Sequence, residues 1–348
     1  MTESDNRLNE LKQWLTTLEL PGGCQIKSIR PASSDASFRR YFRVDTNDQR
    51  SLIVMDAPPP QEDCAPFVHA GEVLQQAGVC VPEIFDRDLT RGFLVLSDLG
   101  NTTMLDRLLE HPDQADPLYR AACAQLIALQ QGSEPGVFAD YDRATLSREL
   151  KLFDQWYLSK HLQVELSEAE RQALTTVYDL ILDNNLAQPR VYVHRDWHSR
   201  NLMVLSAPDK PATAPELAVI DFQDALYGPV TYDLVSLLRD AYVDWPEDQQ
   251  IDWAARYWDA ARMADIPVQP DFGDFYRDFE WMGMQRHLKV LGIFARLACR
   301  DNKTAYLADM PRVLGYVMAT ARRYREFAPL VTLIRRLDGI EEKAAFTF

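Results

Sequence analysis

Residues 194–201 read HRDWHSRN, and residues 220–223, which follow after a short loop, read IDFQ. The first stretch matches the pattern H-R-D-x-x-x-x-N, in which an acid precedes an amide at a fixed spacing. Apolar runs typical of strands border both stretches, at residues 191–193, 202–205 and 217–220. The pattern therefore predicts that Asp196, Asn201 and Asp221 lie at the ends of short strands.

These three side chains have the chemistry that phosphoryl transfer requires. The reaction needs an acceptor oxygen held in line with the phosphoryl group and Mg²⁺ to neutralise the charge on the phosphate. Asp196 would accept the proton of the attacking hydroxyl, while Asn201 and Asp221 would offer Mg²⁺ the hard oxygen ligands that it prefers. The sequence therefore predicts a kinase with ATP and Mg²⁺ as cofactors.

Two other interpretations of the same residues stay open. His194, Asp196 and His198 alternate as in the metal site of a hydrolase, because imidazole and carboxylate groups suit zinc. That interpretation leaves Asn201 and Asp221 without a role. The other alternative is a protein that binds nucleotide without catalysis, because the lysine expected on the third strand of a kinase is missing.

Length and composition predict a two-lobed globular protein. With 348 residues the chain exceeds the roughly 250 to 300 residues at which a single core stops growing. Its formal net charge of −15 argues against binding nucleic acid through phosphate neutralisation. No stretch approaches the roughly 20 apolar residues of a membrane span, and the first residues do not resemble a secretory signal. We expect a cytoplasmic monomer that acts on a small molecule.

The order of the predicted elements indicates an α+β fold. A helix over residues 6–18 precedes a small antiparallel sheet, with one main helix over residues 62–77 inside the sheet region. Its strands are expected at residues 25–30, 38–44, 51–55, 81–85 and 93–96. Helical patterns then dominate, at residues 105–110, 117–131, 144–162, 168–185, 232–242, 249–263, 271–299 and 310–326. We predict a nucleotide-binding lobe (1–96), a hinge (97–101) and a catalytic and substrate-binding lobe (102–348).

The chain resembles the protein-kinase-like fold and, within it, the aminoglycoside phosphotransferase and choline kinase branch. The resemblance rests on the order of the elements and on residues 220–234, IDFQDALYGPVTYDL, and it covers nearly the whole chain. In that branch Asp233 braces the catalytic loop without touching substrate, and His194 is likewise structural. The resemblance therefore implies a two-lobed small-molecule kinase.

A narrower resemblance concerns residues 37–44, 55–58 and 233–242. These stretches look like the bacterial anomeric kinases of cell-wall recycling, which phosphorylate the C1 hydroxyl of N-acetylmuramic acid and N-acetylglucosamine. The resemblance implies a sugar 1-kinase, whereas the residue spacing alone predicts only a small-molecule kinase. An aminoglycoside or choline-type kinase is the alternative.

The nucleotide contacts depart from the usual kinase pattern, because Met55 occupies the position of the third-strand lysine. Arg39, Tyr41 and Arg43 share one face of the preceding strand by the alternation of side chains. We predict that Tyr41 lies over the adenine, and that Arg39 or, as second choice, Arg43 meets the phosphates and pairs with Glu72. The alternative is that these arginines are solvated charges of an edge strand.

The remaining predicted contacts come from loops. The chain has no G-x-G-x-x-G loop, so the backbone near a Ser-rich turn has to approach the phosphates. The predicted phosphate-loop residues are Ser33, Ser34, Ala36 and Ser37, and the predicted adenine-binding hinge residues are Ser97 and Leu99. The predicted acceptor contacts are Arg195, Trp197, Asp224 and Tyr227, with Trp197 stacking on a sugar face.

Overall fold

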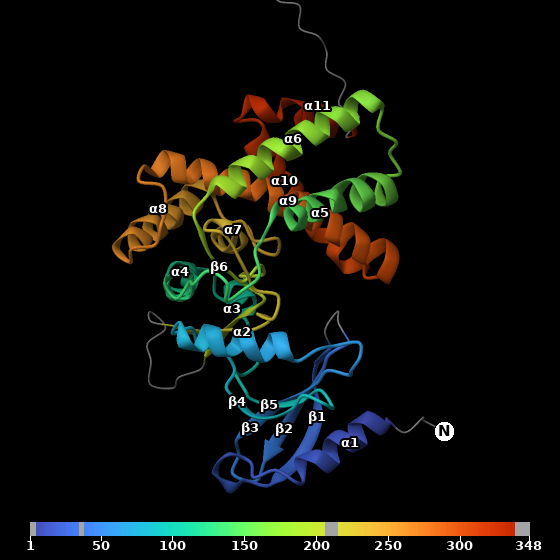
Figure 1. The fold of residues 1–348 in the computed structure, drawn as a ribbon, viewed down its shortest axis with the longest axis vertical. Helices are drawn as coiled ribbons and strands as arrows, with labels where there is room; N and C mark the ends of the chain where they lie inside the picture. The colour runs from blue at the N-terminus through green and yellow to red at the C-terminus, as the bar shows by residue number, and fades with distance from the viewer. Residues whose placement is uncertain (1–4, 35–37, 206–214, 338–348) are drawn as a thin grey trace, which may run out of the picture. The chain divides into compact units, whose positions relative to one another are not determined.

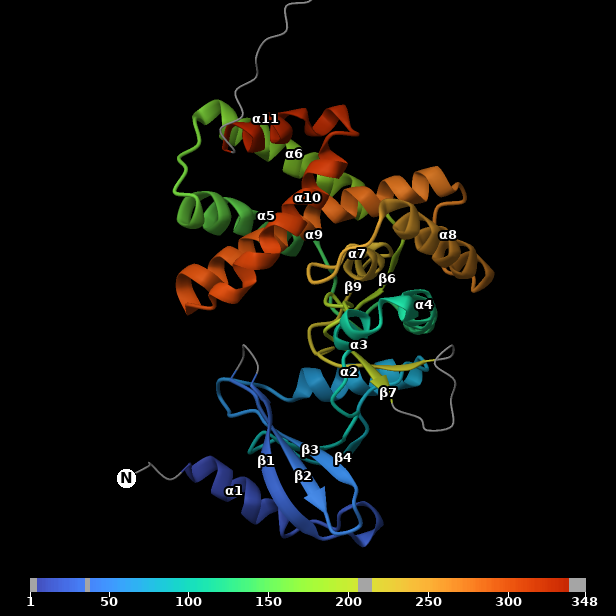
Figure 2. The ribbon, with the colours of Figure 1, turned by 180° about the vertical axis from the view of Figure 1, so that it is seen from behind.

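The computed structural model describes residues 5–34, 38–205 and 215–337 (Figures 1 and 2). These residues form two compact units, one within 1–121 and 200–224, the other within 122–199 and 225–348. Ala36 and Ser37 lie outside the described residues, and the predicted boundary at residues 97–101 stays a prediction. Among the residues described, no helix has both the length and the apolar character of a membrane span.

The first unit contains a five-stranded sheet whose neighbouring strands are all antiparallel. The strands are β1 (Ile26–Ser34), β2 (Arg40–Thr46), β3 (Ser51–Asp56), β4 (Ile84–Asp88) and β5 (Phe93–Ser97), in the order β1-β2-β3-β5-β4. Tyr41 on β2 pairs in register with Met55 on β3. The predicted small antiparallel sheet is confirmed.

Two helices cover the two faces of this sheet (Figure 1). On one face lies α1 (Asn6–Leu15), whose Leu11, Trp14 and Leu15 pack with Phe42 and Val44 of β2 in one hydrophobic core. On the other face lies α2 (Ala65–Gln76). Because side chains alternate along a strand, Tyr41 and Arg43 point away from the α1 core.

A short hairpin completes the part of this unit that carries predicted site residues. It consists of β7 (Leu202–Leu205) and β8 (Glu216–Val219), with Leu202 opposite Val219. The hairpin contacts α3 (Met104–Glu110) through a bridge between Thr103 and Met203. The unit also includes η1 (Pro21–Gly23), η2 (Pro112–Gln114) and the start of α4 (Ala115–Gln131).

The second unit is mostly helical, as predicted. Its strands β6 (Arg190–Val193) and β9 (Leu226–Pro229) form an antiparallel pair, and β9 was not expected. Its helices are α5 (Arg143–Leu152), the π-helix η3 (Phe153–His161), α6 (Glu168–Ala187), α7 (Tyr232–Leu238), α8 (Glu247–Met263), α9 (Phe272–Asp301), η4 (Thr304–Asp309), α10 (Met310–Ala321), η5 (Arg325–Phe327) and α11 (Ala328–Leu337). The 30-residue helix α9 packs against α5, η3, α6, α7 and α10.

One predicted helix differs from the structure in its winding. Residues 144–162 were expected to form a single α-helix, but the α-helical part ends at Leu152 and a π-helix continues. At this junction α9 approaches closely through Gly292, where a Cβ atom would lie only 2.4 Å from the carbonyl carbon of Leu152. Only glycine allows this close approach. The amphipathic pattern of residues 144–162 contains no sign of the contact with Gly292, so it predicted a continuous α-helix.

Candidate active site

Asn201 and Asp221 leave the two ends of the β7–β8 hairpin side by side. The backbone carbonyl of Asn201 accepts a hydrogen bond from Ile220 N at 3.0 Å, which continues the hairpin pairing. The Asn201 amide nitrogen lies 3.5 Å from Asp221 Oδ2, and the Gln223 amide donates to Asp221 Oδ1 at 2.7 Å. The hairpin therefore brings the predicted amide and carboxylate together.

The backbone around Asp221 is held in an uncommon conformation. Asp221 has a φ of +66°, in the left-handed region that few non-glycine residues adopt. The next residue, Phe222, is fully buried and its ring lies 4.7 Å from that of Phe67 on α2. A Cβ atom on Gly71 would come within 3.3 Å of the Phe222 ring, so α2 and this ring pack in tight contact. Helix α2 thus fixes the chain immediately after Asp221.

The donor set of Asn201 and Asp221 fits Mg²⁺ better than zinc. Both side chains offer hard oxygen atoms, whereas zinc favours nitrogen and sulfur ligands. Within residues 5–34, 38–205 and 215–337, no group of three or more His, Cys, Asp or Glu side chains is placed to hold a metal ion. The alternation of His194, Asp196 and His198 therefore does not produce the zinc site of the hydrolase alternative.

In the second unit, Asp233 holds the start of the 194–201 loop. Its two carboxylate oxygens accept hydrogen bonds from His194 N at 2.6 Å and from Arg195 N at 2.9 Å. Arg195 has a φ of +79°, so the chain turns sharply just before Asp196. This is the bracing geometry that the family resemblance implies for Asp233.

A second carboxylate, Asp240, holds the loop further along, and sequence reasoning missed it. Asp240 Oδ2 accepts from Ser199 N at 2.9 Å and from Ser199 Oγ at 2.5 Å. Its Oδ1 accepts from Tyr242 N at 2.9 Å. The only signal in the sequence was its place in the 233–242 stretch, seven residues after Asp233.

The electrostatic surroundings of Asp196 keep it ionised. Burial alone would raise the pKa of Asp196, but the nearby charge of Lys289, followed by His198, Arg286 and His194, outweighs burial and brings the pKa to about 2. The backbone is fixed as well, since Asp196 N donates to His194 Nδ1 at 3.2 Å and His198 N donates to Asp196 O at 3.0 Å. Asp196 is therefore a carboxylate at neutral pH, the form that can accept a proton.

Asp233 gives a testable pH dependence of stability. Burial raises the pKa of Asp233 to about 7, although the backbone N–H groups of His194 and Arg195 favour the ionised form. In an unfolded chain the same carboxyl has a pKa of about 3.9. The native pKa is higher than the unfolded one. Between about pH 4 and 7, the native state therefore keeps a proton on Asp233 that the unfolded state does not have.

We therefore expect the stability contributed by this proton to be complete below about pH 4 and lost as the pH rises through about 7. The free energy of unfolding of the wild type minus that of Asp233→Asn should fall by up to about 1.4 kcal/mol per pH unit between about pH 5 and 7. Denaturant unfolding curves at several pH values measure this difference. A difference that stays constant with pH would contradict the raised pKa.

In the first unit, Arg43 forms an ion pair and hydrogen bonds with residues 98–101 of the predicted hinge. Its guanidinium lies 2.6 Å from Asp98 Oδ2, donates to the Gly100 carbonyl at 2.8 Å, and also donates to the Asn101 side chain. Ser51 Oγ donates to the same Asp98 oxygen at 2.6 Å. The donors of Arg43 therefore hold residues 98–101 to strand β2, which favours Arg39 over Arg43 as the phosphate contact.

Arg39 pairs with a different glutamate from the one predicted. Its Nε lies 3.2 Å from Glu62 Oε2, and Glu62 Oε1 accepts from Phe38 N at 3.1 Å. Glu72 instead pairs with Arg87 on β4 at 3.0 Å. The predicted pairing of Arg39 with Glu72 is wrong, because α2 begins only at Ala65 and turns Glu72 toward β4.

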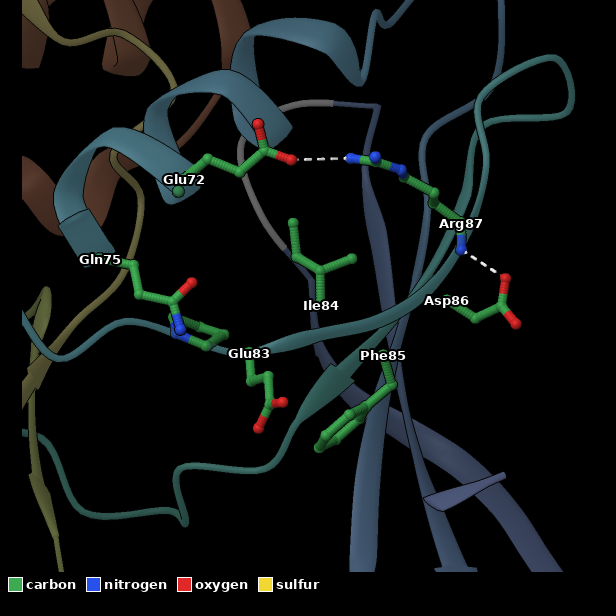
Figure 3. Close-up of a pocket in the computed structure, with 9 residues that line it drawn as sticks. Glu72, Gln75, Glu83, Ile84, Phe85, Asp86 and Arg87 are labelled. Atoms are coloured by element: carbon green, nitrogen blue, oxygen red, sulfur yellow. Dashed lines mark hydrogen bonds and ion pairs between the residues drawn. The ribbon is translucent and has the colours of Figure 1, made fainter. Parts of the chain in front are cut away.

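Glu72 lines a pocket of about 490 Å³ between α2 and β4 (Figure 3). The lining residues are Gly71, Glu72, Gln75, Pro82, Glu83, Ile84, Phe85, Asp86 and Arg87. In Figure 3 the Glu72 and Arg87 side chains reach toward each other above Ile84. Of the predicted nucleotide contacts that the structure describes, Glu72 alone lines this pocket.

Three more of the predicted nucleotide contacts, Ser33, Ser34 and Ser97, lie at strand ends. Ser33 and Ser34 end β1 and pair in register with Tyr41 and Arg40. Ser97 ends β5, and its Oγ accepts from Glu83 N at 2.9 Å. Leu99 follows within the segment that Arg43 holds. Their contacts with nucleotide stay predictions.

Among the predicted acceptor contacts, the prediction that Trp197 stacks on a sugar is wrong. Its side chain is fully buried and packs edge-on against His194, with ring centroids 5.6 Å apart, so no face is free to stack on a sugar. Asp224 is exposed in the first unit. In the second unit, Tyr227 lies on β9 with the Arg190 guanidinium 4.6 Å from its ring. The Arg195 guanidinium donates a hydrogen bond from Nη2 to Glu149 Oε1 at 2.6 Å.

Comparison with known proteins adds sequence relatives and structural neighbours. A family model described as "Phosphotransferase enzyme family" matches residues 28–272. An N-acetylmuramate/N-acetylglucosamine kinase of Pseudomonas aeruginosa is 48% identical over 341 residues, which is 96% of this chain and 97% of the relative. A protein of the same name from Neisseria meningitidis serogroup B is 45% identical, covering 97% of this chain and 98% of the relative.

Solved structures agree with the fold at low sequence identity. Choline kinase LicA of Streptococcus pneumoniae has a TM-score of 0.63 at 12% identity, covering 90% of this chain and 99% of its own. An ADP-bound aminoglycoside phosphotransferase has a TM-score of 0.56 at 15% identity, covering 88% of this chain and 97% of its own. The predicted protein-kinase-like fold is confirmed.

Proposed function

Since the chain belongs to the phosphotransferase enzyme family, we propose that it transfers the γ-phosphate of ATP to the anomeric C1 hydroxyl of N-acetylmuramate and N-acetylglucosamine. The observation that carries this substrate class is the similarity, over nearly the full length, to relatives named as kinases of these two sugars. The product would be a sugar 1-phosphate in the recycling of peptidoglycan.

In the proposed reaction Asp196 orients the acceptor hydroxyl and accepts its proton. A base positioned in this way contributes on the order of 10²- to 10⁴-fold to the rate. The C1 hydroxyl of a sugar is more acidic than an ordinary alcohol, so a carboxylate of low pKa is adequate. Asp233 and Asp240 support this role, because they fix the backbone on both sides of Asp196.

Asn201 and Asp221 would hold Mg²⁺ through their side-chain oxygens. When bound, Mg²⁺ neutralises the charge on the β- and γ-phosphate oxygens. The chain contributes the positions of these oxygens, which the β7–β8 hairpin and the burial of Phe222 against α2 restrict.

Arg39 is the proposed cation for the ATP phosphates in place of the third-strand lysine. We expect Arg39→Met to raise the KM for ATP by about 10-fold or more, since hydrogen bonds to charged groups are worth roughly 1.5 to 3 kcal/mol. Initial rates at varied ATP concentration measure this change. Arg30→Met, on the neighbouring strand β1, is the matched control and should leave the KM unchanged. An unchanged KM in Arg39→Met would remove Arg39 from the site.

One assay tests the substrate class. ATP consumption is measured with N-acetylmuramate, N-acetylglucosamine, kanamycin and choline as separate acceptors. The proposal requires turnover with the two sugars and a product that is acid-labile and lacks a reducing end. Turnover with kanamycin or choline alone would instead support the aminoglycoside or choline-type alternative. Tight ATP binding without turnover of any acceptor would support the non-catalytic alternative.

A further inference from the structure

A single buried carboxylate, that of Glu149 on α5, collects donors from three other segments of the second unit. Its Oε1 lies 2.6 Å from Arg195 Nη2 and 3.0 Å from Lys289 Nζ on α9. Its Oε2 accepts from the Tyr141 hydroxyl and, at 3.1 Å, from the Gln285 amide on α9. Only 6% of Glu149 is exposed to solvent. A buried charge of this kind is tolerated because it is paired and fully hydrogen-bonded.

Lys289 forms the second half of this cluster. It is 7% exposed, and its Nζ donates to the Tyr232 hydroxyl on α7 at 2.9 Å as well as pairing with Glu149. Burial disfavours the charge of both groups, but the Lys289 and Arg195 charges lower the pKa of Glu149, and Tyr232 and Glu149 raise that of Lys289. The cluster therefore keeps its charges inside the protein and joins α5, α7 and α9.

Arg195 connects this cluster to the proposed catalytic base. Its backbone has a φ of +79°, and a bulky residue keeps such a conformation only where the surroundings determine it. Asp233 binds the backbone N–H of Arg195, and Glu149 binds the far end of its side chain. The guanidinium also lies 5.5 Å from the centre of the Tyr141 ring. The residue that precedes Asp196 is thus held at both ends.

We propose that Glu149 and Lys289 are positioning residues for phosphoryl transfer: the shared carboxylate holds the Arg195 side chain and so fixes the left-handed turn that orients Asp196. This inference rests on the proposed function, in which Asp196 is the base. Arg195 then acts by anchoring the loop. Lys289 has two roles: it keeps Glu149 ionised and in place, and its charge also helps to keep Asp196 ionised.

The test compares Glu149→Gln, Lys289→Met and the double variant. Glu149→Gln leaves the Arg195 and Lys289 charges without their carboxylate, so we expect kcat for sugar phosphorylation to fall by about 10- to 100-fold, as expected when a reacting group is misplaced by about 1 Å. The KM for ATP should change less than about 2-fold, because Asp196 and Arg195 belong to the acceptor step. Lys289→Met should lower kcat less, since Arg195 keeps its partner.

The double variant separates positioning from stability. Removing Lys289 together with the Glu149 charge takes away an uncompensated buried charge, so the melting temperature should recover toward the wild type relative to Glu149→Gln. The kcat should not recover, because Arg195 still lacks its carboxylate. If kcat recovers in parallel with the melting temperature, the cluster is merely structural and the proposal is overturned.

Asp154→Asn is the matched control. Asp154 is another partly buried carboxylate of this unit, it accepts from the Tyr178 hydroxyl, and it lies on η3. Its replacement should lower the melting temperature and leave kcat unchanged. A fall in kcat like that of Glu149→Gln would overturn the proposal, because any buried carboxylate would then have the same effect.

A failure of this inference is distinguishable from a failure of the proposed function. If the wild type phosphorylates neither sugar, the substrate class is wrong. The same variants are then compared through the slow hydrolysis of ATP, in which Asp196 would orient water in place of the sugar hydroxyl. A 10-fold or greater loss of that hydrolysis in Glu149→Gln, with ATP binding by calorimetry unchanged, supports the positioning role. Wild-type rates in folded Glu149→Gln, with either acceptor, overturn it.

Discussion

Asp196→Asn is expected to lower kcat by about 10²- to 10⁴-fold, the contribution of a positioned general base. The asparagine keeps the size of the side chain and its backbone hydrogen bonds with His194 and His198, but it cannot take up the proton of the acceptor. The KM for ATP should stay within a few-fold of the wild type, because the loss concerns the acceptor. Steady-state rates with N-acetylglucosamine and ATP measure both constants.

Folding has to be checked in this variant, because the change also removes a negative charge from a buried cluster that includes Lys289 and Arg286. Circular dichroism and the melting temperature provide this check. Asp154→Asn, the same substitution elsewhere in the second unit, should keep full activity. A correctly folded Asp196→Asn enzyme that works at the wild-type rate would refute the assignment of the base.

Asp221→Asn should produce the second large loss, about 10³-fold in kcat/KM, because metal coordination to phosphate oxygens is worth several kcal/mol in the transition state. The amide retains one oxygen but loses the negative charge that attracts Mg²⁺. Activity should therefore depend on a higher Mg²⁺ concentration than in the wild type and should recover in part when Mg²⁺ is raised. Titration of the rate with Mg²⁺ at saturating ATP measures this shift.

Asp45→Asn is the control for this experiment. Asp45 is a carboxylate of the same unit, on β2, where it pairs with Arg30 at 3.3 Å. Its replacement should leave both the rate and the Mg²⁺ requirement unchanged. If Asp221→Asn has the same Mg²⁺ dependence as this control, Asp221 is not a metal ligand.

The local patterns of the sequence were sufficient for the sheet and for the pair of Asn201 and Asp221. Strand alternation is a short-range property, and a hairpin necessarily brings its two ends together, so the residues before β7 and after β8 had to be neighbours. The residues of the 194–201 loop are likewise close together in the fold, because only a few consecutive residues separate them. For these residues the sequence predicted their placement beside one another, whereas their roles stay predictions.

Contacts between distant segments were not predictable in the same way. The choice of Glu62 over Glu72 as the partner of Arg39 depends on where α2 begins and which way it faces. In the Glu149 cluster, Glu149 on α5 pairs with Lys289 on α9, 140 positions further along the chain. Trp197 looked available for stacking because a sequence does not report burial. In each case the deciding factor is the packing of whole helices, which leaves only weak traces in local composition.

The two carboxylates of the α7 region have a consequence for the dynamics of the loop. Asp233 lies in the first turn of α7 and Asp240 lies just beyond its end. Their carboxylates accept hydrogen bonds from the backbone N–H groups of His194, Arg195 and Ser199. These amides become accessible to water only when their partners beside α7 move away, so they share one opening free energy with that helix. The loop should therefore lose its order as one cooperative unit with α7, without gradual fraying from either end.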